Sequence, residues 1–179
     1  MRILSQVPGS VLWLLESTSA ASENLRREAS SRGVQAARLV FAPRVSLPEH
    51  LARHRAADLF LDTLPYNAHT TASDALWTGL PVLTCTGQAF ASRVAASLLS
   101  AMDMPELITG TQQDYEALAI ALAQDPQQLD SLKRKLAKNR LNTPLFDAAL
   151  FTRHLEDAYT QMYARCQAGE GPEQIEVRG

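Results

Sequence analysis

The chain has 179 residues, and its 17 Lys and Arg against 19 Asp and Glu give a formal net charge of −2. Hydrophobic residues make up 46% and charged residues 20%, so the chain has enough apolar side chains for a core and is not globally disordered. The length suits one compact domain or two very small ones. The near-neutral charge argues against binding nucleic acid or a membrane surface through bulk positive charge.

The two cysteines, Cys85 and Cys166, are too few for a disulfide framework or a cysteine-rich zinc site. We expect them to be buried free thiols in a reducing compartment. No apolar run approaches the roughly 18 residues that a membrane-spanning helix needs. The N-terminal sequence MRILSQVPGS has no apolar signal-peptide core. These features predict a soluble, cytoplasmic protein with no membrane partner.

Short apolar runs alternate with helical patterns along the first two thirds of the chain. The runs are nearly continuous in apolar residues, which is typical of strands that are covered on both faces. We predict strands at 11–16, 37–43, 58–63, 81–86 and, more weakly, 106–109, and helices at 20–32, 47–56, 71–78 and 91–101. This rhythm predicts βαβ units and a Rossmann-like, three-layer α/β sandwich with a parallel sheet.

The last third of the chain changes to helical periodicity only. Leu155, Tyr159, Met162 and Cys166 recur at helical spacing in a long helix that we expect at about 147–166. We therefore predict extra C-terminal helices on an α/β domain that extends over residues 1–168. The polar segment 169–179 is expected to be a flexible tail.

Several common catalytic motifs are absent from the sequence. It has no G-x-x-x-x-G-K-[ST], G-x-G-x-x-G, H-E-x-x-H, C-x-x-C or G-x-S-x-G pattern. Asp58 and Asp62 flank a predicted strand without forming a D-x-D metal pair, and we interpret both as strand-end residues. The sequence therefore offers no metal site, and a binding site has to be sought where the predicted strands end.

Three polar loops follow predicted strands at 43–50, 64–71 and 86–93, with the sequences PRVSLPEH, LPYNAHTT and TGQAFASR. Ligands of open parallel sheets bind beyond the carboxyl ends of the strands, so we expect these loops to meet at one edge. The second loop enters a helix at His69, Thr70 and Thr71. The unpaired N–H groups and partial positive charge of a helix start suit a phosphate.

Asp74 lies one turn into this helix, where its carboxylate is placed to accept from sugar hydroxyls. A purely structural alternative stays open, because Thr71 and Asp74 also have capping-box spacing, which is worth about 1 kcal/mol to a helix. In the first loop, Ser46 and Glu49 have the same spacing.

The other two loops carry further candidates, each with a structural alternative. His50, Arg53 and His54 lie on an early helix turn and suit a base or a phosphate, or else form a solvated basic face. Gly87 permits a close backbone approach. Ser92 and Arg93 open the next helix, where Arg93 contacts either a ligand or a surface carboxylate.

The sequence contains the segments VLWLLES, EHLARHRAADLFLDTLPYNAHTTASDALWTGLPVLT and GQAFASRVAASLL. Together they resemble the C-terminal catalytic half of O-linked N-acetylglucosamine transferases, the family 41 glycosyltransferases. The resemblance covers about residues 7–168, and its most specific part is D-x-x-x-x-N-x-H-T-T-x-x-D-x-L-W-x-G-x-P. It implies a GT-B enzyme that transfers N-acetylglucosamine from UDP-GlcNAc to Ser or Thr of an acceptor protein without a metal or other cofactor. It also implies an N-terminal catalytic half and, often, tetratricopeptide repeats as further parts.

The resemblance also implies roles for individual residues. His69, Thr70 and Thr71 would hold the UDP diphosphate, and Asp74 would meet the ribose. The uracil would lie against His50 and Arg53 with the backbone of Val45 and Ser46 nearby, and the loop of Gly87, Ser92 and Arg93 would border the diphosphate or sugar. No residue qualifies as a general base.

The sequence departs from the family pattern at Leu47, where members commonly carry a nucleotide-binding lysine. The strand and helix expected upstream of VLWLL and the whole N-terminal half are also absent, so we expect a fragment that binds UDP weakly and is inactive alone. Two alternatives stay open: a non-catalytic Rossmann-like protein-interaction module, and a GT-B relative that uses another nucleotide sugar.

The apolar stripe of the helix at 147–166 is expected to be partly exposed. In the intact enzyme this helix would cross toward the N-terminal half, and in this chain a homodimer is a second way to cover the stripe.

Overall fold

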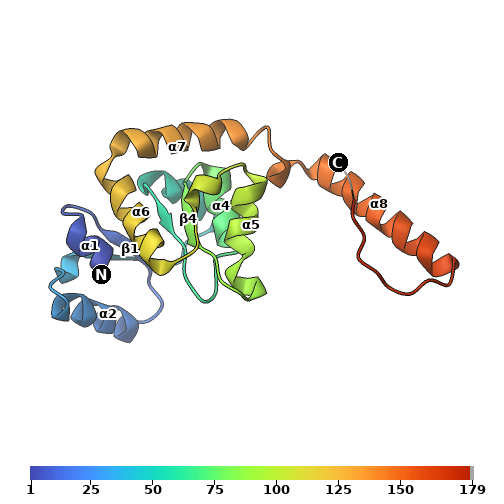
Figure 1. Cartoon of the computed structure of the whole chain (residues 1–179). Helices are drawn as coiled ribbons and strands as arrows, with labels where there is room; N and C mark the ends of the chain where they lie inside the picture. Colours follow the sequence, from blue (N-terminus) through green and yellow to red (C-terminus); the bar gives the residue numbers. More distant parts are fainter. Residues whose placement is uncertain (178–179) are drawn as a thin grey trace.

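The computed structural model describes residues 1–177 and shows parallel strands interleaved with helices (Figure 1). The strands are β1 (Leu12–Leu15), β2 (Leu39–Ala42), β3 (Phe60–Leu61), β4 (Val82–Cys85) and β5 (Ile108–Thr109). The helices are α1 (Arg2–Gln6), α2 (Ser19–Ser31), α3 (Leu47–Arg53), α4 (Thr70–Thr78), α5 (Val94–Ala101), α6 (Gln112–Gln124), α7 (Pro126–Asn139) and α8 (Ala148–Gln167).

Each predicted strand and helix of the α/β part is present, and the Rossmann-like α/β expectation is confirmed. Four details differ. Helix α1 was not expected, and β3 keeps only two residues. The helix expected at 47–56 divides into α3 and a 3-10 turn, η2 (His54–Ala56), and the helix expected at 91–101 divides into a 3-10 turn, η3 (Phe90–Ser92), and α5.

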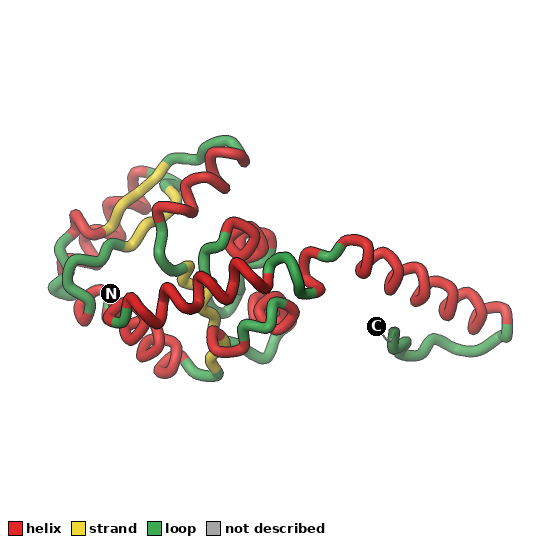
Figure 2. Tube along the Cα trace, turned by 90° about the horizontal axis from the view of Figure 1, so that it is seen from above, coloured by secondary structure: helices red, strands yellow, loops and turns green. Residues whose placement is uncertain are grey.

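The strands form two parallel sheets, whereas the sequence predicted one. Strand β1 pairs with β2, and β4 lies between β3 and β5. Figure 2 shows the β1–β2 pair set apart from the central strands. Within residues 1–177 no ladder joins the two sheets. All four residues of β4 are buried, as expected for a strand with a neighbour on each side.

The main core lies around β4 and draws on four helices. Its buried side chains include Leu76 from α4, Leu99 from α5, Leu122 from α6 and Leu136 from α7. A smaller core beneath β1 and β2 contains Leu4, Ala29, Val34 and Leu39.

Helix contacts join the two sheets. Helix α1 packs on α6, where Arg2 pairs with Glu116 and the side chain of Gln124 donates to the carbonyl of Gln6 at 3.2 Å. On the other side, α3 packs against α4. The residues that follow β2 therefore lie beside the helix that follows β3.

Helix α8 projects from the body (Figure 1). None of its residues is buried. The expectation of two buried thiols is therefore wrong for Cys166, which is exposed, and holds for Cys85. The prediction of an exposed apolar stripe is therefore confirmed, and what covers the stripe stays a prediction. Its exposed large side chains are Phe151, Leu155, Tyr159, Met162 and Tyr163.

The predicted tail at 169–179 lies partly outside the described residues. Within 169–177 the chain has no helix or strand, and its flexibility stays a prediction. Arg165 of α8 pairs with Glu170 and Glu173 at 3.3 and 2.8 Å. Among the described residues, no helix has both the length and the apolar character to cross a bilayer.

Ending the chain after Asp147 should leave the stability of the body unchanged, because α8 buries no side chain. We expect the free energy of unfolding in urea to change by less than about 0.5 kcal/mol. Ending it after Arg140 provides the matched control, because Leu145 and Phe146 pack against the main core and would be lost. A large loss from the first truncation would show that α8 supports the body.

Candidate functional site

Helix α4 begins with unpaired backbone donors. His69 is the N-cap residue, and no side-chain oxygen caps this end. The first intrahelical bond is donated by Ser73 to the carbonyl of His69 at 3.1 Å. Among residues 1–177, no acceptor binds the N–H groups of Thr70 or Thr71. These exposed donors carry the partial positive charge of the helix start.

The two capping-box patterns have different outcomes. The capping alternative for Thr71 and Asp74 is wrong, because both residues lie inside α4 and no hydrogen bond joins them. Ser46 and Glu49 do form a box, in which the Ser46 N–H and hydroxyl donate to the Glu49 carboxylate at 3.1 and 2.7 Å. Both bonds lower the pKa of Glu49, and the bond from the hydroxyl has the larger effect. The hydroxyl of Ser46 is therefore engaged within its own turn.

The loop that leads into α4 is fixed by the buried carboxylate of Asp62. This carboxylate accepts from the Ala68 N–H and from the Thr84 hydroxyl of β4, both at 2.6 Å. The Tyr115 hydroxyl donates to the Asp62 carbonyl at 2.8 Å. Burial, with the Asp62 charge nearby, raises the pKa of Tyr115 and keeps this donor protonated. Asp62 was predicted to be only a strand-end residue, and the contacts that give it this role come from distant segments of the chain.

Asn67 joins the second loop to the third. Its side chain is buried and donates to the Thr63 carbonyl at 2.9 Å, and its N–H donates to the Ala91 carbonyl at 2.8 Å. A backbone hydrogen bond therefore ties the second loop to the third. Asn67 was noted only as part of the family motif, and its contact with Ala91 lies beyond what that motif shows.

The third loop is closed by Gly87 and Ser92. The Gly87 N–H donates to the Ser92 carbonyl at 2.9 Å, and a Cβ on Gly87 would lie only 2.8 Å from that of Ser92. This close approach requires glycine. The buried Ser92 hydroxyl donates to the Ala89 carbonyl at 2.8 Å, so it shapes the loop. Arg93 is exposed and forms no salt bridge with a carboxylate among the described residues.

Arg53 is held in place on the first loop's side of the site. It contacts His50 Nδ1 at 2.8 Å, donates to the Pro43 carbonyl at 3.0 Å and lies over the Trp13 ring at 5.6 Å. A freely solvated basic face would lack such contacts. Val45 and Leu47 are exposed on the same segment.

His54 is buried, so its placement with His50 and Arg53 as a ligand contact or a solvated face is wrong, and it instead fastens this segment to α4. Its Nδ1 lies 3.1 Å from the hydroxyl of Thr78, which itself donates to helix carbonyls, so we assign the proton to Nδ1. Burial lowers the pKa of His54, the charge of His50 lowers it further, and Asp74 opposes this shift. A neutral His54 therefore packs beside the half-buried Asp74.

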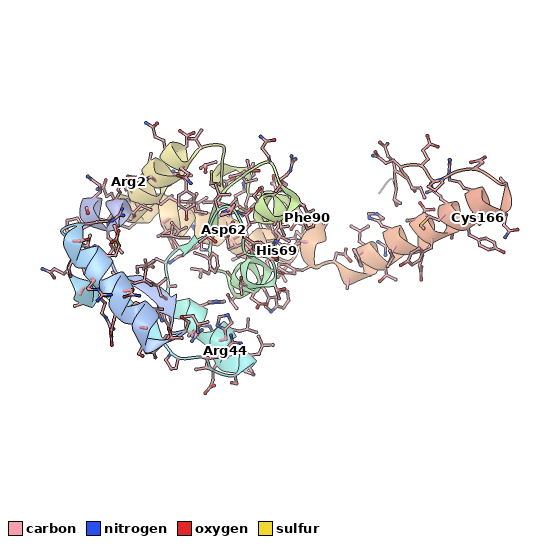
Figure 3. All side chains as sticks on the ribbon, turned by 90° about the horizontal axis from the view of Figure 1, so that it is seen from below. Arg2, Arg44, Asp62, His69, Phe90 and Cys166 are labelled. Atoms are coloured by element: carbon pink, nitrogen blue, oxygen red, sulfur yellow. The ribbon has the colours of Figure 1, made fainter. Side chains whose placement is uncertain are left out.

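His69 lies in an aromatic cluster beside a cavity of about 370 Å³ that Phe60, Asp62, Tyr66 and Thr71 help to line. Its ring stacks on that of Tyr66 at 4.8 Å and 19°, and the Phe90 ring meets it edge-on at 6.3 Å and 86°. The buried Nε2 of His69 has no hydrogen-bond partner among residues 1–177. Figure 3 shows His69 with Asp62 and Phe90 in the middle of the body.

The structure therefore joins the second and third loops directly and places His50 and Arg53 on the helix packed against α4. No three His, Cys, Asp or Glu side chains gather as a metal site within the described part of the chain. Independence from metal stays a prediction.

Comparisons with known proteins identify the family. A sequence model of glycosyl transferase family 41 matches residues 1–155, and the chain belongs to this family. It is 38% identical over 169 residues to the UDP-N-acetylglucosamine--peptide N-acetylglucosaminyltransferase of Caenorhabditis elegans, covering 94% of this chain and 15% of the relative. It is 36% identical over 176 residues to the probable UDP-N-acetylglucosamine--peptide N-acetylglucosaminyltransferase SEC of Arabidopsis thaliana, and the match covers 98% of this chain and 18% of the relative.

A solved structure supports the same assignment. A mutant O-GlcNAc transferase of Thermobaculum terrenum matches with a TM-score of 0.87 at 34% identity, covering 94% of this chain and 33% of that chain. The resemblance found in the sequence is therefore confirmed. The chain spans less than a fifth of these two curated relatives and a third of the solved chain.

Replacing Asp62 by Ala should cost about 2–4 kcal/mol of unfolding free energy, because the buried Thr84 hydroxyl and the Ala68 N–H lose their acceptor. Asp58→Ala is the matched control on the other side of β3. Its side chain is 81% exposed and pairs only with Lys133, so we expect a change below about 1 kcal/mol. Urea titrations measure both, and equal effects would contradict the role of Asp62.

Proposed function

We propose that this chain is the nucleotide-sugar-binding half of a protein O-GlcNAc transferase, which binds UDP-GlcNAc for transfer to Ser or Thr. The observation that carries the proposal is the buried Nε2 of His69 beside the N–H groups of Thr70 and Thr71, none of which has a hydrogen-bond partner among the described residues. A buried polar atom without a partner costs about 1–3 kcal/mol, and a bound ligand removes that cost. Family membership favours a nucleotide sugar as this ligand.

The geometry suits a diphosphate leaving group. Negative charge develops on the diphosphate as the bond to the sugar breaks, and fixed donors aimed at it stabilise the transition state. In this proposal the N–H groups of Thr70 and Thr71, their hydroxyls and the His69 imidazole supply such donors. They do so without a metal or other cofactor.

The nucleoside would extend from α4 toward α3. Asp74 is proposed to accept from the ribose hydroxyls, and the uracil would lie against His50 and Arg53. Because the Ser46 hydroxyl and N–H are bonded to Glu49, the backbone contact to the base falls mainly to Val45. Gly87, Ser92 and Arg93 would border the sugar side, where only Arg93 presents a side chain without an internal bond.

The remaining parts of the proposal lie outside this chain. The acceptor protein, the general base and an N-terminal catalytic half, with or without tetratricopeptide repeats, would complete a cytoplasmic enzyme. A second candidate is a protein-interaction module, which the exposed stripe of α8 favours. Self-association through α8 with no effect of nucleotides on the melting temperature would support it over donor binding.

Calorimetric titration tests the donor site. We expect weak binding of UDP and weaker binding of UMP, which lacks the second phosphate. His69→Ala should reduce UDP affinity about 10- to 100-fold, as expected for a hydrogen bond to a charged group. His154→Ala, on α8, is the matched histidine control and should change nothing. A chain that binds no UDP, or binds it equally after His69→Ala, would overturn the proposal.

Leu47→Lys should strengthen UDP binding about three- to tenfold. Leu47 is the first residue of α3 and is 61% exposed, so a lysine fits there and brings a positive charge to the nucleotide side. Leu47→Gln is the uncharged control. The gain should shrink at high salt, because exposed charges are screened. The same gain from Gln would contradict an electrostatic role at this position.

A further inference from the structure

Aromatic rings, rather than hydrogen bonds, hold the imidazole of His69. Among residues 1–177 its side chain forms no hydrogen bond, and its contacts with other aromatic rings are the parallel stack on Tyr66 and the edge of Phe90. Phe90 is 81% exposed. Of these two aromatic contacts, the stack on Tyr66 therefore restrains the plane of the imidazole more strongly.

The backbone beneath Tyr66 is fixed, although its ring is not part of a core. The Tyr66 carbonyl accepts from the Thr63 hydroxyl at 2.9 Å, and the next residue is the buried Asn67. Tyr66 is 63% exposed and belongs to neither core cluster. A large aromatic ring that stays exposed to water on an anchored loop contributes little to the free energy of folding. Its specific contact is the face of His69.

We infer that Tyr66 is a positioning residue, which holds the His69 imidazole in the orientation that meets the donor's diphosphate. This inference rests on the proposed function. Tyr66 acts through His69 and is not itself assigned a bond to the nucleotide. A stacked imidazole has less freedom to lose when the diphosphate binds, and the gain appears as affinity.

A double-mutant cycle tests this role, with Tyr66→Leu, Tyr66→Phe, His69→Ala and the Tyr66→Leu/His69→Ala double variant. Calorimetry measures UDP and uridine binding to each. Tyr66→Leu should weaken UDP binding about three- to tenfold, as expected for loss of an aromatic pair, while Tyr66→Phe keeps the ring and stays within twofold. In the His69→Ala background, Tyr66→Leu should have no further effect. Uridine, which has no phosphate, should bind all four variants alike.

A readout without ligand checks the stack itself. The ring current of Tyr66 should shift the imidazole proton signals of His69, and Tyr66→Leu but not Tyr66→Phe should abolish that shift. Equal losses from Tyr66→Leu with and without His69, or an unchanged UDP affinity, would overturn the inference while leaving UDP binding intact. A wild-type chain that binds no UDP would instead remove the proposed function, and this inference with it.

Discussion

The candidate site depends on one buried carboxylate. Burying a charge is costly unless hydrogen bonds replace its hydration. Asp62 receives two such bonds, one from the hydroxyl of Thr84 on the central strand β4 and one from the backbone of Ala68. The loop between β3 and α4 is thereby fastened to the buried central strand of its sheet. Asn67 links this loop to the third loop through its bond to Ala91. The first turn of α4 begins three residues after Asn67.

The sequence predicted the elements of the fold better than their pairing. Continuous apolar runs indicate strands wherever they occur, because burial on both faces leaves a local signature. Helix α1 has only five residues, too few for a periodic pattern. The division into two sheets depends on contacts between distant segments, and a pattern within one run carries no information about them.

The candidate site was predicted in its residues but not in its arrangement. The segment from His69 to Asp74 was singled out correctly as a helix start, yet the spacing of Thr71 and Asp74 does not reveal which residue is the N-cap. Tertiary contacts decide this, because Asp62 holds Ala68 and the helix begins just beyond it. The Tyr66 stack is also invisible in sequence, since side chains three residues apart in a loop have no fixed relation.

Under the proposed function, a bound nucleotide would also stabilise the arrangement of the two separate sheets. The residues proposed to bind the base follow β2 and those proposed to bind the phosphates follow β3. Within the described chain, no ladder joins these strands, and helix packing links the two sheets. A ligand that contacts residues from both sheets would link them where no backbone hydrogen bonds do. A bound nucleotide would then resist sliding of one sheet relative to the other, so the substrate would stiffen the fold that binds it.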